Sequence, residues 1–99
     1  MTTKPFGLFE ITDRVALVTG GSRGLGAIIA EALAHAGASV IITSTNETEI
    51  KARAEAISLA TNRKVVGIKG DVSIESDCKK IIEIAENTFN QLDILINNA

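Results

Sequence analysis

Apolar residues alternate along the chain between short continuous runs and stripes of helical spacing. Four runs rich in valine, isoleucine and leucine have the length and continuity of buried parallel strands, and they span Arg14–Thr19, Ser39–Thr43, Lys64–Lys69 and Leu92–Ile96. The three segments between them carry apolar residues three or four positions apart, as amphipathic helices do. The pattern therefore predicts four strands that alternate with three helices.

Polar and glycine residues mark the ends of the predicted helices. The first helix is expected over Gly24–Ala36, with Gly37 in a left-handed cap, while Asn46 caps the second helix and Ser73 the third. The side chains expected to face the core are Leu25, Ile29, Ala32, Leu33 and Ala36, then Ile50, Ala54, Ile57 and Thr61, then Cys78, Ile81, Ile82, Ala85 and Phe89. Met1–Phe9 is expected to be a loosely ordered lead-in.

This alternation predicts the fold class. Short strand–helix–strand connections make right-handed crossovers and hence a parallel sheet. We expect an α/β fold, a Rossmann-type doubly wound parallel sheet whose first four strands have the order 3-2-1-4, with three helices. In such sheets a ligand lies at the carboxyl ends of the strands where the strand order reverses, here between the first and fourth strands.

A glycine-rich turn joins the first strand to the first helix. It reads Thr-Gly-Gly-Ser-Arg-Gly-Leu-Gly over residues 19–26. Glycine is needed where φ is positive or where a Cβ would hold a phosphate away, and the helix end supplies N–H groups and positive potential. The turn lacks the Gly-Lys-Ser/Thr ending of a P-loop. It predicts a pyrophosphate site at Gly20, Ser22, Arg23, Gly24, Leu25 and Gly26.

The residues after the second strand bear on cofactor choice. A carboxylate at the end of the second strand would bind the adenosine ribose of NAD. This chain has Ser44 and Thr45 at that place, and the first acidic residue after the strand is Glu47. Hydroxyl groups can donate to a 2′-phosphate, and Arg23 can supply a positive charge. These residues favour NADP over NAD. The alternative is that Arg23 is a solvated loop charge and that Ser44 and Thr45 only begin the next helix.

Two further motifs follow strands. Asp71 and Val72 follow the third strand, where the carboxylate can accept from an adenine amino group and the Val72 backbone can meet a ring nitrogen. Alternatively, Asp71 satisfies backbone donors at the start of the next helix. The fourth strand runs into Asn97-Asn98-Ala99, where the chain ends. Amide side chains suit a ligand site because each offers a donor and an acceptor.

Together these motifs resemble the short-chain dehydrogenase/reductase family. The Thr-Gly-x-x-x-Gly-x-Gly turn, Asp71-Val72 and Asn97-Asn98-Ala99 match its motifs from about Thr12 to Ala99, over the cofactor-binding half only. The resemblance implies that Asp71 and Val72 line the adenine pocket and that Asn97 braces the strands. It also implies that Asn98 and Ala99 lie near the nicotinamide-side ribose, and that an arginine before the second glycine goes with NADP.

The family's catalytic tyrosine, its lysine four residues on, and the assisting serine and asparagine all lie beyond this motif. The chain contains no tyrosine, so no catalytic residue is assigned. We expect residues 1–99 to be the N-terminal part of a dinucleotide-binding domain of an NAD(P)-dependent oxidoreductase that interconverts an alcohol and a carbonyl, and to be inactive alone. The alternatives are a dinucleotide-sensing module without a tyrosine and an extended-type epimerase or dehydratase, whose glycines are generally spaced Thr-Gly-x-x-Gly-x-x-Gly.

The composition and net charge limit the kinds of partner that we expect. The chain is 45% hydrophobic and 22% charged with a net charge of −2, which gives no reason to expect nucleic acid or a membrane as partner. Cys78 and His35 are single residues of their types, so we expect no metal site. A cytoplasmic, homo-oligomeric enzyme with a small-molecule substrate is expected. The isolated chain should associate through its open fourth strand, with Ile94 and Ile96 exposed.

Overall fold

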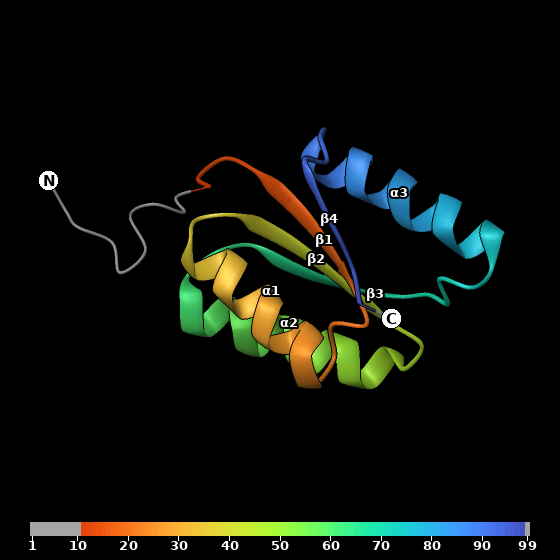
Figure 1. Ribbon diagram of the computed structural model, residues 1–99, viewed down its shortest axis with the longest axis horizontal. Coiled ribbons are helices and arrows are strands. Elements are labelled where there is room, and N and C mark those ends of the chain that lie inside the picture. Colours follow the sequence, from red (N-terminus) through yellow and green to blue (C-terminus); the bar gives the residue numbers. More distant parts are fainter. Residues whose placement is uncertain (1–10, 99) are drawn as a thin grey trace, which may run out of the picture.

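The computed structural model describes residues 11–98, in which helices cover both faces of a four-stranded sheet (Figure 1). The lead-in predicted over Met1–Phe9 and the candidate residue Ala99 lie outside the described residues. The elements follow in the predicted order: β1 (Val15–Thr19), α1 (Gly24–His35), β2 (Ser39–Ser44), α2 (Glu47–Thr61), β3 (Val65–Lys69), α3 (Glu75–Phe89) and β4 (Ile94–Asn97).

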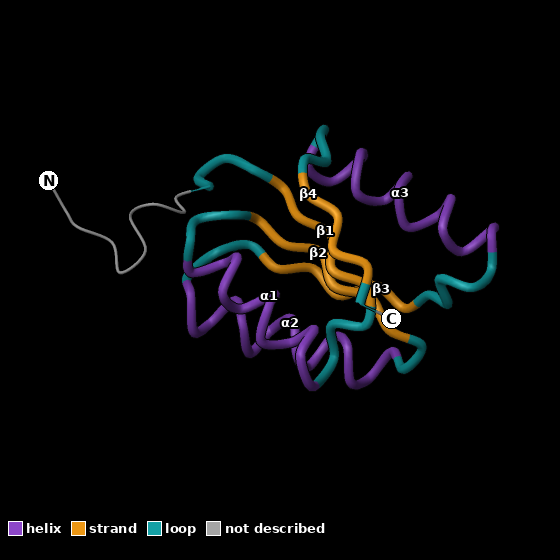
Figure 2. Tube along the Cα trace, viewed as in Figure 1, coloured by secondary structure: helices purple, strands orange, loops and turns teal. Residues whose placement is uncertain are grey.

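The sheet is parallel throughout and has the order β3-β2-β1-β4. Leu17 of β1 lies opposite Ile41 of β2 on one side and opposite Leu95 of β4 on the other. Figure 2 shows α1 and α2 on one face of the sheet and α3 on the other. The predicted fold class and strand order are confirmed.

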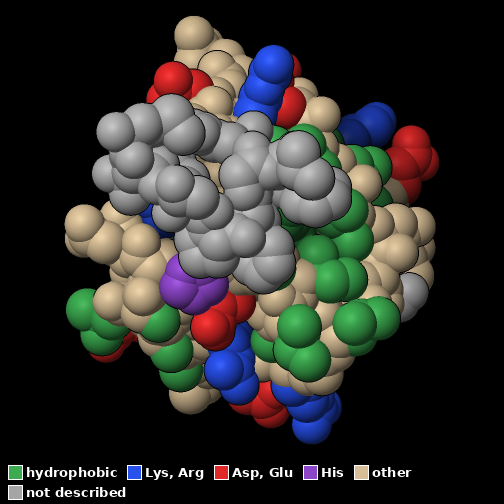
Figure 3. Space-filling view, turned by 60° about the vertical axis from the view of Figure 1, so that its left-hand side comes forward, with side chains coloured by type: hydrophobic (Ala, Val, Ile, Leu, Met, Phe, Trp, Pro, Cys, Tyr) green, Lys and Arg blue, Asp and Glu red, His purple; other side chains and the backbone are tan. Residues whose placement is uncertain are grey.

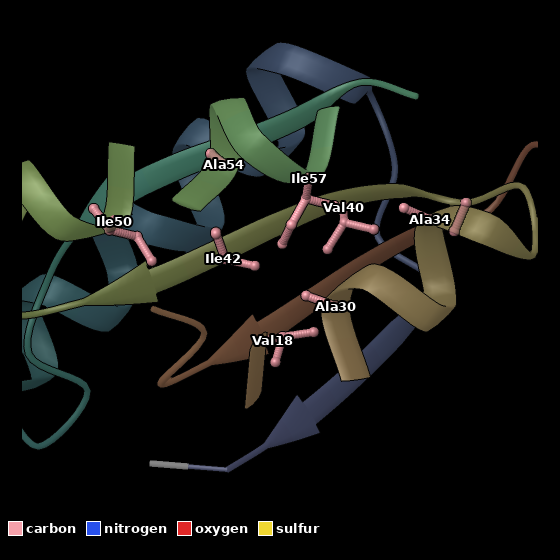
Figure 4. Packing of buried hydrophobic residues seen from close by; sticks show 9 residues of the cluster. Val18, Ala30, Ala34, Val40, Ile42, Ile50, Ala54 and Ile57 are labelled. Carbon is pink, nitrogen blue, oxygen red and sulfur yellow. The ribbon is translucent and has the colours of Figure 1, made fainter. Parts of the chain in front are cut away.

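The two faces of the sheet carry separate cores. Figure 4 shows the core on the α1 and α2 face, where strand side chains meet small residues of α1 and larger ones of α2: Val18, Ala30, Ala34, Val40, Ile42, Ile50, Ala54 and Ile57. The other core lies beneath α3 and comprises Val15, Leu17, Ile41, Ile68, Ile81 and Ala85. Burial on both faces explains why the central strands read as continuous apolar runs.

The prediction for the inward face of α1 is wrong in part. The buried residues are the small ones, Gly26, Ala27, Ala30 and Ala34. Leu25, expected to face the core, is 63% exposed, and Ala32 is also exposed. Because small side chains let the helix approach the sheet closely, the larger Ile29 and Leu33 pack only at the margin of the core.

The caps of α1 and α2 are as predicted. Gly37 has φ +108° just after α1, and the Asn46 side chain accepts a hydrogen bond of 2.9 Å from the Glu49 amide at the start of α2. The inward stripe of α2 is buried at Ile50, Ala54 and Ile57. The end of α1 and the start of α2 are therefore readable from single residues.

The predicted start of α3 is wrong. Its N-cap position is Ile74, which provides no side-chain hydrogen bond, while the amide and hydroxyl of Ser73 both donate to Asp71 Oδ1. Ile81 and Ala85 are buried as expected, but Ile82 is 38% exposed. The turn formed by Asp71 uses the serine that would otherwise cap the helix.

Two hydrogen bonds between Asp93 and Val15 hold the amino end of β4 against β1. Asp93 Oδ2 accepts from the Val15 amide at 2.8 Å, and the Asp93 amide donates to the Val15 carbonyl at 2.9 Å. The hydrogen bond from Val15 lowers the pKa of Asp93 below its ordinary value, and Gln91 and Arg14 add to this effect. A lowered pKa favours the folded state above pH 4, and this contribution is lost as the pH falls through the folded-state pKa.

Strand β4 pairs with β1 alone among the described residues, so one of its edges is open. The expectation that Ile94 and Ile96 would be exposed is corrected, because both are half-buried, and Ile96 packs against the core on the α1 and α2 face. The exposed residue of β4 is Leu95, at 60%. Figure 3 shows hydrophobic side chains gathered on one side of the face that it presents. An open strand edge beside exposed apolar side chains favours pairing with another chain.

We therefore expect the isolated 99-residue chain to self-associate. Leu95→Lys should reduce association by placing a charge beside the open edge. Leu59→Lys is the matched control, because Leu59 is 78% exposed on α2 and does not lie on β4. Size-exclusion chromatography with light scattering measures the effect. A monomer at every concentration, or equal effects of the two substitutions, would contradict the role of the β4 edge.

Candidate functional site: a glycine turn at the carboxyl ends of the strands

The glycine turn has the backbone conformation that its sequence predicted. Gly20 and Gly24 have φ of +68° and +62°, which favours glycine at both positions. A Cβ added to Gly24 would meet nothing within 4 Å, so the backbone there faces open space. The turn therefore presents bare backbone to whatever approaches the start of α1.

Gly26 serves a different purpose. A Cβ at this position would lie 2.1 Å from the Gly20 carbonyl oxygen and 2.7 Å from Asn98 Nδ2. No side chain fits there unless the backbone of the turn moves. Gly26 is thus required for the close packing of α1 against the turn, and Asn98 supports the same place by donating to the Gly20 carbonyl at 3.3 Å.

The start of α1 differs from that of α2 in its electrostatics. Its N-cap residue, Arg23, makes no side-chain cap, and the first turn contains no acidic residue. Helix α2 instead has the Asn46 cap and two acidic residues in its first turn, Glu47 and Glu49. The positive end of the α1 dipole is therefore left for an external anion, which the bare glycine backbone can approach closely. The residues fit a pyrophosphate.

Thr19 and the two asparagines brace this end of the sheet. The Thr19 hydroxyl donates to Asn97 Oδ1 at 3.2 Å and accepts from the Asn98 amide at 2.9 Å. The amide of Gly21 donates to the Thr43 carbonyl at 3.0 Å, which ties the turn to β2. These bonds support the bracing role that the resemblance implied for Asn97. Sequence analysis missed Thr19 as a positioning residue, although it opens the glycine motif.

Two of the three candidates for the 2′-phosphate, Ser44 and Arg23, already have partners in the structure. The Ser44 hydroxyl donates to the Asn46 carbonyl at 3.1 Å and accepts from the Asn46 amide at 3.2 Å, so it forms a local turn. Thr45 is exposed. The side chain of Arg23 is 82% exposed, and its Nε lies 3.9 Å from Glu49 Oε1. Phosphate binding by Ser44 would require its hydroxyl to rotate away from this turn.

Asp71 forms the turn that leads into α3. Its Oδ1 accepts from the Ser73 hydroxyl at 2.6 Å and from the Ser73 amide at 2.9 Å, and both bonds lower the pKa of Asp71. This is the structural alternative considered for Asp71. A hollow of 420 Å³ lies between Asp71 and the end of β2, lined by Thr45, Lys69, Gly70, Asp71, Asp77 and Lys80. Val72 is half-buried and its carbonyl accepts from Cys78 Sγ at 3.1 Å.

Other chemistry is sparse in the described part of the chain. His35 is exposed at the end of α1, and its Nε2 lies 3.6 Å from Glu31 Oε2. Cys78 is half-buried on α3. No group of three or more histidine, cysteine, aspartate or glutamate side chains between residues 11 and 98 could hold a metal ion. None of the helices described is long and apolar enough to cross a membrane.

Comparison with known proteins agrees with this geometry. A family model described as short chain dehydrogenase matches residues 14–99. The chain is 41% identical over 90 residues to the 3-oxoacyl-(acyl-carrier-protein) reductase FabG of Aquifex aeolicus, covering 91% of this chain and 36% of the relative. It is 32% identical over 90 residues to the 11-beta-hydroxysteroid dehydrogenase A of Sesamum indicum, covering 91% of this chain and 26% of the relative.

A solved structure is similar as well. The Pseudomonas aeruginosa RhlG/NADP active-site complex superimposes with a TM-score of 0.85 at 37% identity, over 92% of this chain and 36% of that one. The chain thus spans between about a quarter and just over a third of the length of these relatives. The family model covers nearly all of the described residues, and its fold and glycine turn are present. The chain therefore belongs to the short-chain dehydrogenase family.

Proposed function

We propose that this chain is the N-terminal, cofactor-binding half of an NADP-dependent oxidoreductase that interconverts an alcohol and a carbonyl. The observation that carries the proposal is the uncapped start of α1 behind the glycine turn, which suits a pyrophosphate. By "full-length protein" we mean this chain with the catalytic half that we propose follows it. We expect it to be a cytoplasmic homo-oligomer with a small-molecule substrate.

The residues present have distinct roles in this proposal. The α1 amides bind the pyrophosphate, and Gly26 with Asn98 holds the turn in place. Asp71 and Val72 line the adenine side, while Asn98 lies toward the nicotinamide-side ribose. The bound cofactor supplies or accepts the hydride. A proton must also reach the developing alkoxide, and we assign that role to the catalytic half.

Preference for NADP is the finer part of the proposal. Arg23 can pair with a 2′-phosphate, and the residues after β2, Ser44 and Thr45, add hydroxyls and no carboxylate. RhlG, whose complex contains NADP, is a related protein. Because the Arg23 side chain is largely exposed, solvent screens its charge and the expected preference is small.

We expect the full-length protein to bind NADPH about fivefold more tightly than NADH, as for one screened charge-assisted contact. Ser44→Asp should reverse this order, because its carboxylate repels the 2′-phosphate and can accept from the ribose hydroxyls of NADH. Thr88→Asp adds the same charge at the far end of α3 and serves as control. Dissociation constants measured by calorimetry test this; equal or tighter binding of NADH by the unmodified protein would contradict it.

A further inference from the structure

A side chain of α2 reaches the glycine turn. Arg53 Nε donates a hydrogen bond of 3.0 Å to the carbonyl oxygen of Ser22, 31 positions earlier in the sequence. This carbonyl belongs to the peptide group that leads into Arg23, the N-cap residue of α1. Arg53 therefore restrains the turn at the point where the positive end of α1 begins, and sequence analysis gave it no role.

One helical turn before Arg53, Glu49 faces the same place. Its backbone is fixed by the Asn46 cap, and its Oε1 lies 3.9 Å from Arg23 Nε. Arg23 is the cation that we propose for the 2′-phosphate. In the free protein the Glu49 carboxylate pairs with the Arg23 guanidinium, and it repels an incoming 2′-phosphate. Glu49 therefore opposes the positive charge that favours NADP over NAD.

These groups surround one depression. A hollow of 420 Å³ is lined by Ser22, Arg23, Glu49, Ala52, Arg53 and Ala56. The small side chains of Ala52 and Ala56 leave this hollow open. Its charged groups are the guanidinium groups of Arg23 and Arg53 and the carboxylate of Glu49. Because NADP and NAD differ by one phosphate, a charge that faces Arg23 in this hollow affects the binding of NADP far more than that of NAD.

We propose that Glu49 sets how strongly this chain prefers NADP, and that Arg53 positions the glycine turn for both cofactors. Glu49 lowers the preference by competing with the 2′-phosphate for Arg23. Arg53 is a positioning residue that holds the Ser22–Arg23 peptide group, so it supports the binding of both cofactors. This inference rests on the proposed function, because it takes Arg23 as the group that meets the 2′-phosphate.

The first test replaces Glu49 in the full-length protein. Glu49→Gln removes the competing charge and is expected to tighten NADPH binding about two- to fivefold without changing the affinity for NADH, in the range of an exposed ion pair. The gain should shrink at high salt. Glu55→Gln is the matched control, since Glu55 lies on the same helix but lines a different hollow, beside β3. An unchanged ratio of the two dissociation constants would overturn the role of Glu49.

The second test separates positioning by Arg53 from direct contact with phosphate. Arg53→Met is expected to weaken NADPH and NADH by the same factor, and to shift the Arg23 backbone amide resonance because the Ser22 carbonyl loses its donor. Arg53→Lys, which retains a charged donor, should lie between the methionine variant and the unmodified protein. Weakening of NADPH alone, or an unmoved Arg23 resonance, would overturn the positioning role.

Failure of this inference can be told apart from failure of the proposed function. If the unmodified protein binds neither NADPH nor NADH, the proposed function is wrong and the inference fails with it. If the unmodified protein prefers NADPH and the Glu49→Gln ratio is unchanged, only the role of Glu49 is wrong. Calorimetry on the unmodified protein is therefore the first measurement to make.

Discussion

Gly26→Val in the full-length protein is expected to weaken the binding of NADPH and NADH alike by on the order of 100-fold. The branched side chain would overlap the Gly20 carbonyl and Asn98 Nδ2, so the turn must move away from the start of α1. Overpacking of this kind costs about 1–3 kcal/mol, and about 1.4 kcal/mol corresponds to a factor of ten in affinity. Calorimetric titration with each cofactor measures the loss.

The control for this variant is a second glycine, beyond the far end of α1. Gly37→Ala strains a positive φ of +108° and brings a Cβ within 2.7 Å of Thr12 Oγ1, at the opposite end of α1. It should lower thermal stability while leaving cofactor affinity unchanged. A folded Gly26→Val variant with unchanged affinity would show that the glycine turn does not hold the cofactor.

The purified 99-residue chain is expected to show no NADPH-dependent carbonyl reduction. Hydride addition requires a proton donor at the developing alkoxide, and this donor alone contributes about 10²–10⁴-fold to such rates. The chain contains no tyrosine, the residue that supplies this proton in the family that the sequence resembles. Absorbance at the NADPH band with small ketones and aldehydes tests this, with the full-length protein as positive control.

Two outcomes of that assay would change the account. Reduction by the 99-residue chain above the rate without protein would mean that a proton donor exists among its residues. A full-length protein that binds NADPH but reduces no carbonyl would favour the alternative of a dinucleotide-sensing module. Reading the sequence beyond Ala99 for Tyr-x-x-x-Lys distinguishes the enzyme from the module independently.

The sequence predicts the sheet better than it predicts the helix faces. The strands are recognisable because burial on both sides makes them continuously apolar, and the doubly wound fold type then predicts their order. In α1 almost every residue is apolar, so helical spacing alone offers two inward faces. The choice between Leu25 and Ala30 depends on how closely the helix approaches the sheet, which tertiary packing decides.

In the candidate site, too, features set by local sequence could be predicted and contacts between distant residues could not. The glycine positions and the Asn46 cap follow from local motifs, and the structure confirms their conformations or contacts. The family resemblance implied a bracing role for Asn97, but it did not identify Thr19 as its partner. The bond from Arg53 to Ser22 joins residues far apart in sequence and has no local pattern. Likewise, nothing in the sequence decides whether Ser73 caps α3 or bonds to Asp71, because both need the same hydroxyl.

The central claim is that the start of α1, behind the glycine turn, binds the pyrophosphate of a nicotinamide dinucleotide. Adding NADPH to the ¹⁵N-labelled full-length protein and following backbone amide resonances tests this claim most directly. We predict large, saturable shifts at the amides of residues 22–26 and smaller ones at Asp71 and Val72, with none around Thr88 at the far end of α3. Saturable binding that leaves the amides of residues 22–26 unmoved would contradict the account.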